Sequence, residues 1–147
     1  MDGNKTVKIT RLILDSRRRN PTFYPNPNSF IINLDETIQN IAKIELTHAF
    51  VQFNSTAEPD DYIIIKIIDL EHIVGVNNND PIDKSFALIN YNTNYNTPLN
   101  IYRKEFLIPY NLSRIDIKCY NKNGELYDFE NKNFKFEFLI YSLERKI

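Results

Sequence analysis

Residues 134–140 read Phe-Lys-Phe-Glu-Phe-Leu-Ile, and this stretch decides the fold. An apolar side chain occupies every second position from Phe134 to Ile140, and Lys135 and Glu137 lie between them. Side chains along a β-strand point alternately to opposite faces, so this period of two predicts a strand with one buried aromatic face.

Further stretches of the chain show strand periodicity on either side of this one. The sequence predicts strands over residues 6–14, 29–34, 41–53, 62–70, 85–91, 101–108 and 112–120. In residues 41–53 the expected inward side chains are Ala42, Ile44, Leu46 and Phe50. Residues 62–70 are apolar at almost every position, which is typical of a strand covered on both faces.

The segments between these strands are rich in Asn and Pro. Residues 121–124 read Asn-Lys-Asn-Gly, which favours a tight hairpin turn. Residues 35–40 predict one helical turn, with Asp35 as its N-cap. The pattern indicates an all-β fold, an antiparallel β-sandwich of the single jelly-roll-like type. We expect one domain over residues 1–147, in which residues 1–20 form a basic N-terminal strand or arm.

Composition and charge exclude several classes of protein. Of the 147 residues, 42% are hydrophobic and 25% are charged, a composition that excludes collagen. Cys119 is the only cysteine of the sequence, which excludes an internal disulfide scaffold. The N-terminus has no apolar signal-peptide core, and the apolar run over residues 62–68 is too short to be a transmembrane segment. Formal charge is +4 over residues 1–20, −8 over 21–83 and +3 over 84–147, a layout that suits contacts between copies or neighbours.

Residues that carry chemistry are few and scattered. His48 lies in an expected strand and predicts core or interface packing, and Cys119 takes an inward position as a small hydrophobe. Asp69, Glu71 and His72 lack a recognised metal-ligand spacing. The three glycines are isolated, so no phosphate-binding loop is present. The sequence therefore predicts a protein that is not an enzyme and has no cofactor, no metal and no small-molecule substrate.

Two adjoining segments near the N-terminus are the sharpest local features. Arg17, Arg18 and Arg19 could bind phosphate or an acidic patch on a partner, because guanidinium groups bind both in a bidentate manner. The alternative is a solvated or internally paired loop, with Asp15 as a local partner. Nucleic acid is a weaker expectation, because few other basic or stacking groups lie nearby. Residues 24–28, Tyr-Pro-Asn-Pro-Asn, predict a rigid connector because each proline fixes its own φ.

These segments, taken together, resemble the opening of a family of virion proteins from nucleocytoplasmic large DNA viruses, the giant viruses. The family pattern is an aliphatic strand, Asp-Ser-Arg-x-Arg, then Tyr-Pro-Asn-Pro and an alternating strand. Residues 13–20 and 24–34 match it, residues 40–46 are similar to the next family segment, and residues 112–118, 123–129 and 134–138 match the closing part. Arg18 departs from the pattern, since the family usually has an acid there. The motif positions in this chain are Asp15, Ser16, Arg17, Arg19, Tyr24, Pro25, Asn26, Pro27, Phe30, Gly124, Tyr127, Asp128 and Phe129.

The resemblance implies a virion structural protein of the minor capsid or vertex (penton) type. Such a protein would be assembled in the host cytoplasm and would act by self-association, as a homo-oligomer, or by contacts with the major capsid protein. The alternative is a lectin-like module on the virion surface that binds host glycans, for which residues 90–102 are the candidate loop. A β-barrel that binds nucleic acid is a third option, and the acidic middle of the chain argues against it.

Overall fold

The structure is a computed structural model that describes residues 5–70, 85–91 and 102–145. These residues form six β-strands and two 3-10 helices of three residues each, with no α-helix in the described ranges. The elements are β1 (Lys5–Asp15), η1 (Ser16–Arg18), β2 (Ser29–Phe50), β3 (Tyr62–Ile67), η2 (Ile68–Leu70), β4 (Ala87–Asn90), β5 (Tyr102–Tyr120) and β6 (Lys135–Arg145). The predicted all-β, antiparallel fold is confirmed. In the described part of the chain, no helix has the length and apolar character needed to cross a bilayer.

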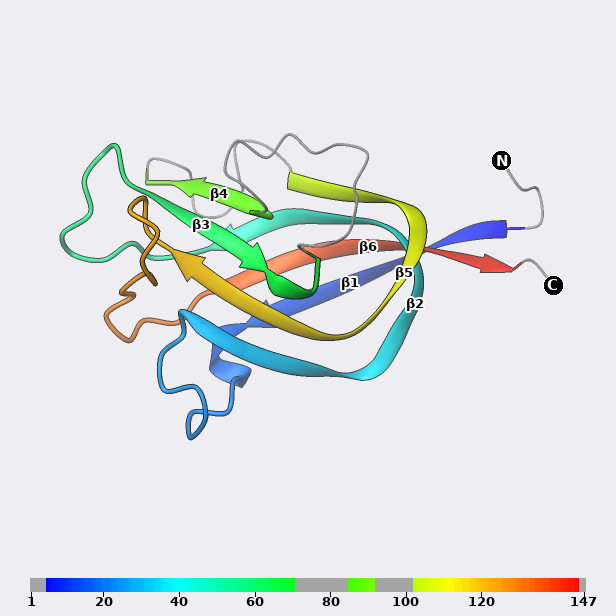
Figure 1. Cartoon of the computed structure of the whole chain (residues 1–147), viewed down its shortest axis with the longest axis horizontal. Coiled ribbons are helices and arrows are strands. Elements are labelled where there is room, and N and C mark those ends of the chain that lie inside the picture. Colours follow the sequence, from blue (N-terminus) through cyan, green and yellow to red (C-terminus); the bar gives the residue numbers. More distant parts are fainter. Residues whose placement is uncertain (1–4, 71–84, 92–101, 146–147) are drawn as a thin grey trace.

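The strands form one sheet in the order β1-β6-β2-β5-β3-β4, and every neighbouring pair is antiparallel. The sheet curls into a half-barrel because β2 and β5 bend together near their middles (Figure 1). The ladder between β2 and β5 changes register three times between Asn33 and Lys43. Asn40 adopts a φ of 56°, in the left-handed region that Asn tolerates better than most residues.

Residues 35–40 belong to β2, so the predicted helical turn capped by Asp35 is wrong. Pairing with β5 overrides the local preference: Ile38 lies opposite Leu112, and the side chain of Asn111 accepts a hydrogen bond from the Asn40 N–H at 2.9 Å. The two strands predicted over 101–108 and 112–120 likewise form the single strand β5. Pro109 lies where the ladder with β2 is irregular, the position in which a strand tolerates a residue without an N–H.

The core lies on the concave side of the sheet. The alternation in β6 is confirmed, since Phe136, Phe138 and Ile140 are buried, and Cys119 of β5 is buried as predicted. Aromatic rings continue this core from strand to strand, with the Phe134 ring 5.8 Å from Phe30 and 5.0 Å from Phe129. The three isoleucines Ile63, Ile64 and Ile65 are all buried, which confirms that β3 is covered on both faces.

One predicted face is wrong at the end of β2. Ile44 and Leu46 are buried as expected, but the ladder with β6 shifts register between Leu46 and His48. The shift buries Ala49 and leaves Phe50 on the convex face, where its ring stacks on His48 at 6.2 Å. A β-bulge exchanges the faces of the residues that follow it, so periodicity alone misplaces them.

Candidate functional site

The opening and closing motifs of the sequence meet at one end of the sheet, in a contact we call the motif junction (residues 15–30 with 119–134). Ser16 is its centre and is fully buried. Its N–H donates to the Phe134 carbonyl at 2.9 Å, and its Oγ accepts from the Phe134 N–H at 2.8 Å. Oγ also lies 2.9 Å from Oδ1 of Asn133. Ser16 therefore extends the β1–β6 contact beyond the last ladder pair, Asp15 with Lys135.

Asp15 and Arg17 form an internal pair at the start of this junction. The Asp15 carboxylate caps η1 by accepting from the Arg17 N–H at 3.0 Å. It also accepts from Nη2 of the same arginine at 2.7 Å. Hydrogen bonding from Arg17 holds the pKa of Asp15 below its usual value, although partial burial opposes this shift.

Arg19 fastens the loop that follows η1. Its guanidinium donates to the carbonyls of Ser16, Tyr24 and Pro25 and to Oδ1 of Asn133, at distances between 2.7 and 3.2 Å. Arg18 is exposed, and it makes no hydrogen bond or ion pair with the described residues. Of the three arginines expected at a partner contact, Arg17 and Arg19 thus bind within the chain, whereas Arg18 points to solvent.

The Tyr-Pro-Asn-Pro-Asn connector joins the same junction. Pro27 is buried and Asn26 is exposed, while Tyr24 packs half-buried against the core. The Asn28 side chain donates to the Tyr127 carbonyl at 2.9 Å, and the Asn28 carbonyl accepts from the Cys119 N–H at 2.9 Å. The connector is therefore bonded to the far end of the chain, and it leads into the buried Phe30.

The closing motif begins with the predicted tight turn, in which Gly124 has a φ of 83°. The side chain of Asn121 accepts from the N–H groups of Asn123 and Glu125, which closes the turn. Tyr127 follows, with its ring buried 4.7 Å from Phe129 and its hydroxyl accepting from the Asn54 N–H at 2.9 Å.

Asp128, the remaining motif residue, has a local role. Its carboxylate accepts from the Glu130 N–H at 2.9 Å, and its carbonyl accepts from the Asn54 side chain. The motif positions thus lie in one structural junction, in which the side chains of Asp15, Ser16, Arg17, Arg19 and Tyr127 bond to other parts of the chain or to the loop backbone.

Of the residues weighed for chemistry, the three that the structure describes, His48, Asp69 and Cys119, form no metal-binding group. His48 lies on the convex face, 41% exposed, with Nδ1 3.2 Å from Oε2 of Glu137; of the expected core or interface packing, the core position is therefore wrong and the interface position stays a prediction. The Asp69 carboxylate accepts from Arg114 at 3.2 Å and from the Asp116 N–H at 2.8 Å. Glu71 and His72 lie outside the described residues. Within the described ranges, no three His, Cys, Asp or Glu side chains are grouped to hold a metal ion.

Cys119 is a core residue near the C-terminal end of β5. Its side chain is fully buried, and burial raises the pKa of its thiol well above the usual value. A neutral, inaccessible thiol is a poor nucleophile, so the side chain behaves as the small hydrophobe that the sequence predicts.

The convex face of β1 carries an apolar row that the sequence analysis did not single out. Val7, Ile9 and Ile13 are 60%, 57% and 39% exposed, and we call these three residues the outer row. Alternate positions of one strand point to one face, so the outer row runs along the edge of the sheet. In the described part of the chain, β1 pairs with β6 alone, which leaves its other edge without a strand partner. The sequence signal for this row is that residues 6–14 have apolar side chains at both odd and even positions, so that both faces of the strand carry apolar groups.

Arg11 and the charged residues of the neighbouring strands are paired within the sheet. Arg11, between Ile9 and Ile13, donates to Glu137 at 2.9 Å, and Glu137 is itself buried. On the next strands, Lys43 lies over the Tyr141 ring at 4.1 Å and pairs with Glu45 at 3.0 Å. The convex face is therefore apolar along its free edge and carries paired charges toward its middle.

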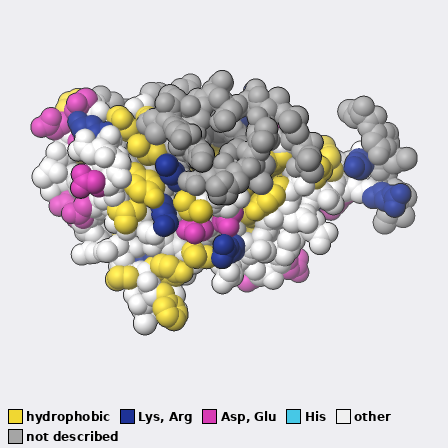
Figure 2. Space-filling model, in the orientation of Figure 1, with side chains coloured by type: hydrophobic (Ala, Val, Ile, Leu, Met, Phe, Trp, Pro, Cys, Tyr) yellow, Lys and Arg dark blue, Asp and Glu magenta, His cyan; other side chains and the backbone are white. Residues whose placement is uncertain are grey.

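The free edge also projects from the body of the protein. The start of β1 and the end of β6 continue past the bend of β2 as a two-stranded ribbon, because the ladder between β2 and β6 ends at Ile41 and Ser142 (Figure 1). Figure 2 shows basic side chains on this ribbon and hydrophobic side chains on the loop between η1 and β2, which contains the 74% exposed Phe23.

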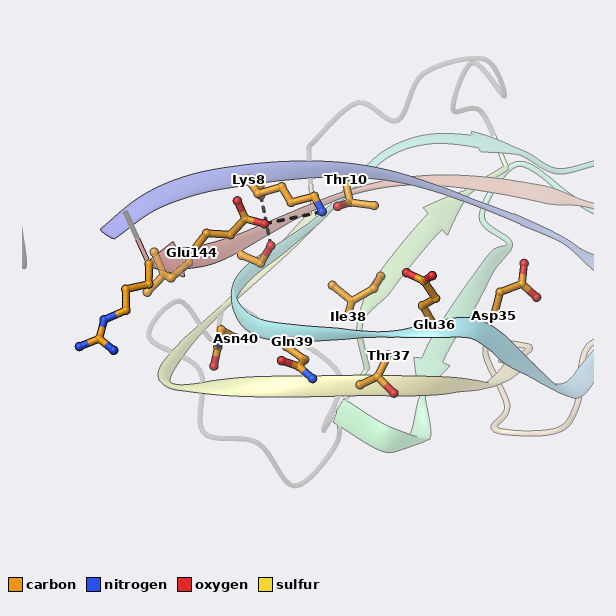
Figure 3. Close-up of a pocket in the computed structure, with 12 residues that line it drawn as sticks. Lys8, Thr10, Asp35, Glu36, Thr37, Ile38, Gln39, Asn40 and Glu144 are labelled. Carbon is orange, nitrogen blue, oxygen red and sulfur yellow. Dashed lines mark hydrogen bonds and ion pairs between the residues drawn. The ribbon is translucent and has the colours of Figure 1, made fainter. Parts of the chain in front are cut away.

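A groove opens where β2 leaves β6. It has a volume of about 870 Å³ and lies between residues 35–40 of β2 and the ribbon. Figure 3 shows Glu36 and Ile38 pointing from β2 toward the ribbon, where Lys8 pairs with Glu144 at 3.6 Å. The lining mixes acidic, basic and amide side chains and contains no aromatic ring among the described residues.

Comparison of the whole chain with models of known protein families and with curated proteins finds no match.

Proposed function

We propose that this chain is a non-enzymatic virion structural protein, a minor capsid or vertex (penton) component that acts by self-association and by contacts with neighbouring capsid proteins. One observation carries the proposal: an apolar outer row lies on a strand edge that has no partner in the described structure.

An unprotected strand edge of this kind favours aggregation of a protein that functions as a monomer. An open strand edge presents unpaired N–H and C=O groups, and natural sheets protect it with short strands, charges, prolines or bulges. β1 is 11 residues long, contains no proline, and keeps a regular ladder with β6 from end to end. Of its three basic residues, Lys5, Lys8 and Arg11, the last two are already paired with Glu144 and Glu137. The edge therefore suits a protein whose working state covers it.

The finer fold that we propose is a single jelly roll. The bends divide β2 and β5 into two halves each, so that eight strand segments result. One group contains β1, β6, residues 41–50 of β2 and residues 102–105 of β5. The other contains residues 29–38 of β2, residues 112–120 of β5, β3 and β4. Two four-stranded groups with the first and last strands adjacent are the jelly-roll arrangement, which viral capsid and lectin domains use.

A contact across the interior supports two facing layers. β6 and β4 stand four places apart in the sheet order, yet the ring of Phe138 in β6 lies 5.8 Å from that of Phe86, next to β4. This contact supports an arrangement in which the two groups of strands face each other over a shared core. Packed inner faces of this kind define a β-sandwich.

The motif junction supports a structural interpretation of the family resemblance. The side chains of Asp15, Ser16, Arg17 and Arg19 bind within the chain. Residues that hold two ends of a chain together favour a shared fold rather than a shared ligand. Arg18, at the departing position, is the member of the triplet open to a partner.

Mass spectrometry of purified virus particles tests the proposal, with co-sedimentation of the purified chain and the major capsid protein as its second part. We expect the chain in the particles at a constant ratio to the major capsid protein. The variant Arg18→Glu should weaken co-sedimentation most at low salt if Arg18 meets an acidic neighbour, because salt screens exposed charges. Absence from particles, with no co-sedimentation, would reject the proposal.

Glycan binding remains the alternative function. Sugar sites need aromatic rings beside polar groups. The groove next to β2 has no aromatic ring among its described lining residues. The candidate loop, residues 90–102, lies almost wholly outside the described residues. A glycan array probed with the purified chain decides between the two functions, since binding of one sugar class would favour the lectin-like module.

A further inference from the structure

We propose that the partner of the β1 edge is a second copy of this chain, joined by antiparallel pairing of the two β1 strands about a two-fold axis at Thr10. The inference rests on the proposed function and specifies the surface through which self-association occurs. It would join two six-stranded sheets into one continuous sheet across the two β1 strands.

The two-fold symmetry restricts which residues can meet. Side chains directly opposite each other in an antiparallel pair point to the same face of the sheet. An axis perpendicular to the sheet therefore pairs odd residues of β1 with odd residues, and the outer row with the outer row. This condition is met only when the two-fold axis passes between two copies of the same residue. Near the middle of Lys5–Asp15, that residue can be Ile9, Thr10 or Arg11.

The register centred on Thr10 is the one in which β1 pairs with its copy along its full length. It places Val7 opposite Ile13 of the second copy, so that members of the outer row cover each other. It places Lys5 opposite Asp15 of the second copy at both ends of the pair, where the Asp15 carboxylate is already bonded to Arg17 of its own chain. All 11 residues of each strand then have a partner, over a length of roughly 37 Å at about 3.4 Å per residue.

The neighbouring registers fit less well. Centring on Arg11 places two arginines directly opposite each other, which is unfavourable for like charges. Centring on Ile9 leaves Leu14 and Asp15 beyond the described start of the opposite strand, so the pairing is shorter.

Three pairs in this register set a polar or charged residue against an apolar one: Thr6 with Leu14, Lys8 with Leu12 and, on the face of the outer row, Ile9 with Arg11 of the second copy. Arg11 already donates to the buried carboxylate of Glu137, so its charge is balanced inside its own sheet. Its aliphatic stem can then lie along Ile9, since long basic side chains bury their methylene groups against apolar neighbours.

Sedimentation equilibrium of the full chain is the first test. We expect a dimer of twice 17.4 kDa for the natural sequence. Ile9→Lys should return it to a monomer, because it sets a second cation beside Arg11 of the other copy. Leu126→Lys is the matched control, since Leu126 is 47% exposed on the hairpin after β5 and the change in charge is the same. The control should remain dimeric.

Cysteine substitution along β1 reads the register. Thr10→Cys should form a disulfide between copies under mild oxidation, because opposed Cα atoms in an antiparallel pair are about 4.5–5.5 Å apart and a disulfide spans about 4.4–6.8 Å. Ile9→Cys and Arg11→Cys should cross-link far less, because in this register each residue lies two positions from its own copy. The native Cys119 is fully buried and stays unreacted in all three variants.

The outcomes separate the inference from the proposed function. A dimer that Ile9→Lys leaves intact, or that cross-links best at position 9 or 11, overturns the inference and leaves self-association in place. A monomer that is nevertheless present in virus particles also overturns it, and then contacts with other capsid proteins carry the function. A monomer that is absent from particles rejects both.

Discussion

Ser16→Ala tests whether the motif junction holds the two ends of the chain together. Ser16 is fully buried, and its Oγ is the acceptor for the buried N–H of Phe134 at 2.8 Å. Alanine removes that acceptor. The Ser16 backbone bond to the Phe134 carbonyl remains, so the two segments should stay close and the Phe134 N–H should stay buried.

The expected loss follows from that single orphaned donor. A buried polar group without a partner costs about 1–3 kcal/mol, and we expect the free energy of unfolding to fall by about 2 kcal/mol. Asn133 keeps its bond from Arg19 at 2.7 Å, so the loss of the Ser16 bond to Asn133 adds little. A fall of this size lowers the ratio of folded to unfolded protein by roughly 30-fold.

Urea denaturation followed by far-ultraviolet circular dichroism measures this change. All variants are compared at one protein concentration, because self-association stabilises the folded form by mass action. Arg18→Ala is the control, since Arg18 is exposed within the same turn and its removal should change stability by less than about 0.5 kcal/mol. If Ser16→Ala matches this control, the junction does not stabilise the fold in the way described.

Three further predictions concern single groups. The pKa of Asp15 is lowered in the folded state, so Asp15 stabilises the fold fully above its unfolded pKa near 3.8, and this stabilisation is lost as the pH falls through the folded pKa. When the free energy of unfolding is measured against pH, it should therefore fall more steeply in acid for the natural chain than for Asp15→Asn. Gly124→Ala should lower the free energy of unfolding by about 1 kcal/mol in urea denaturation, because a φ of 83° strains an L-residue although no atom lies within 4 Å of the added Cβ. The Cys119 thiol, whose pKa burial raises, should resist alkylation at pH 8 in the native protein and react on addition of urea; rapid native labelling would contradict its burial.

The strands could be predicted from the sequence because each buries one face of alternating side chains. Phe136, Phe138 and Ile140 show this most clearly, and the turn ending at Gly124 was equally readable from its Asn-Gly step. The bends could not be predicted. Residues 35–40 have the local features of a helical turn, and only their pairing with β5 makes them part of a strand. The β-bulge before His48 likewise depends on β6, so Phe50 was assigned to the wrong face.

The candidate site divides in the same way. Asp15 was recognised as a local partner for the arginines, because the two residues are close in sequence. The bond from Arg19 to Asn133 and the bond between Ser16 and Phe134 join segments more than 100 residues apart, which no local pattern reveals. The outer row could not be predicted, because the sequence does not distinguish the exposed Val7 and Ile9 from the buried Leu14. Only the position of β1 in the strand order distinguishes them.

A cryo-electron microscopy map of the intact virus particle tests the proposed function most directly. The account predicts density in the capsid for this curled sheet, with the β1 edge paired to a strand of a neighbouring chain. A map in which other proteins explain all the capsid density, or in which the sheet is present with β1 open to solvent, would contradict it.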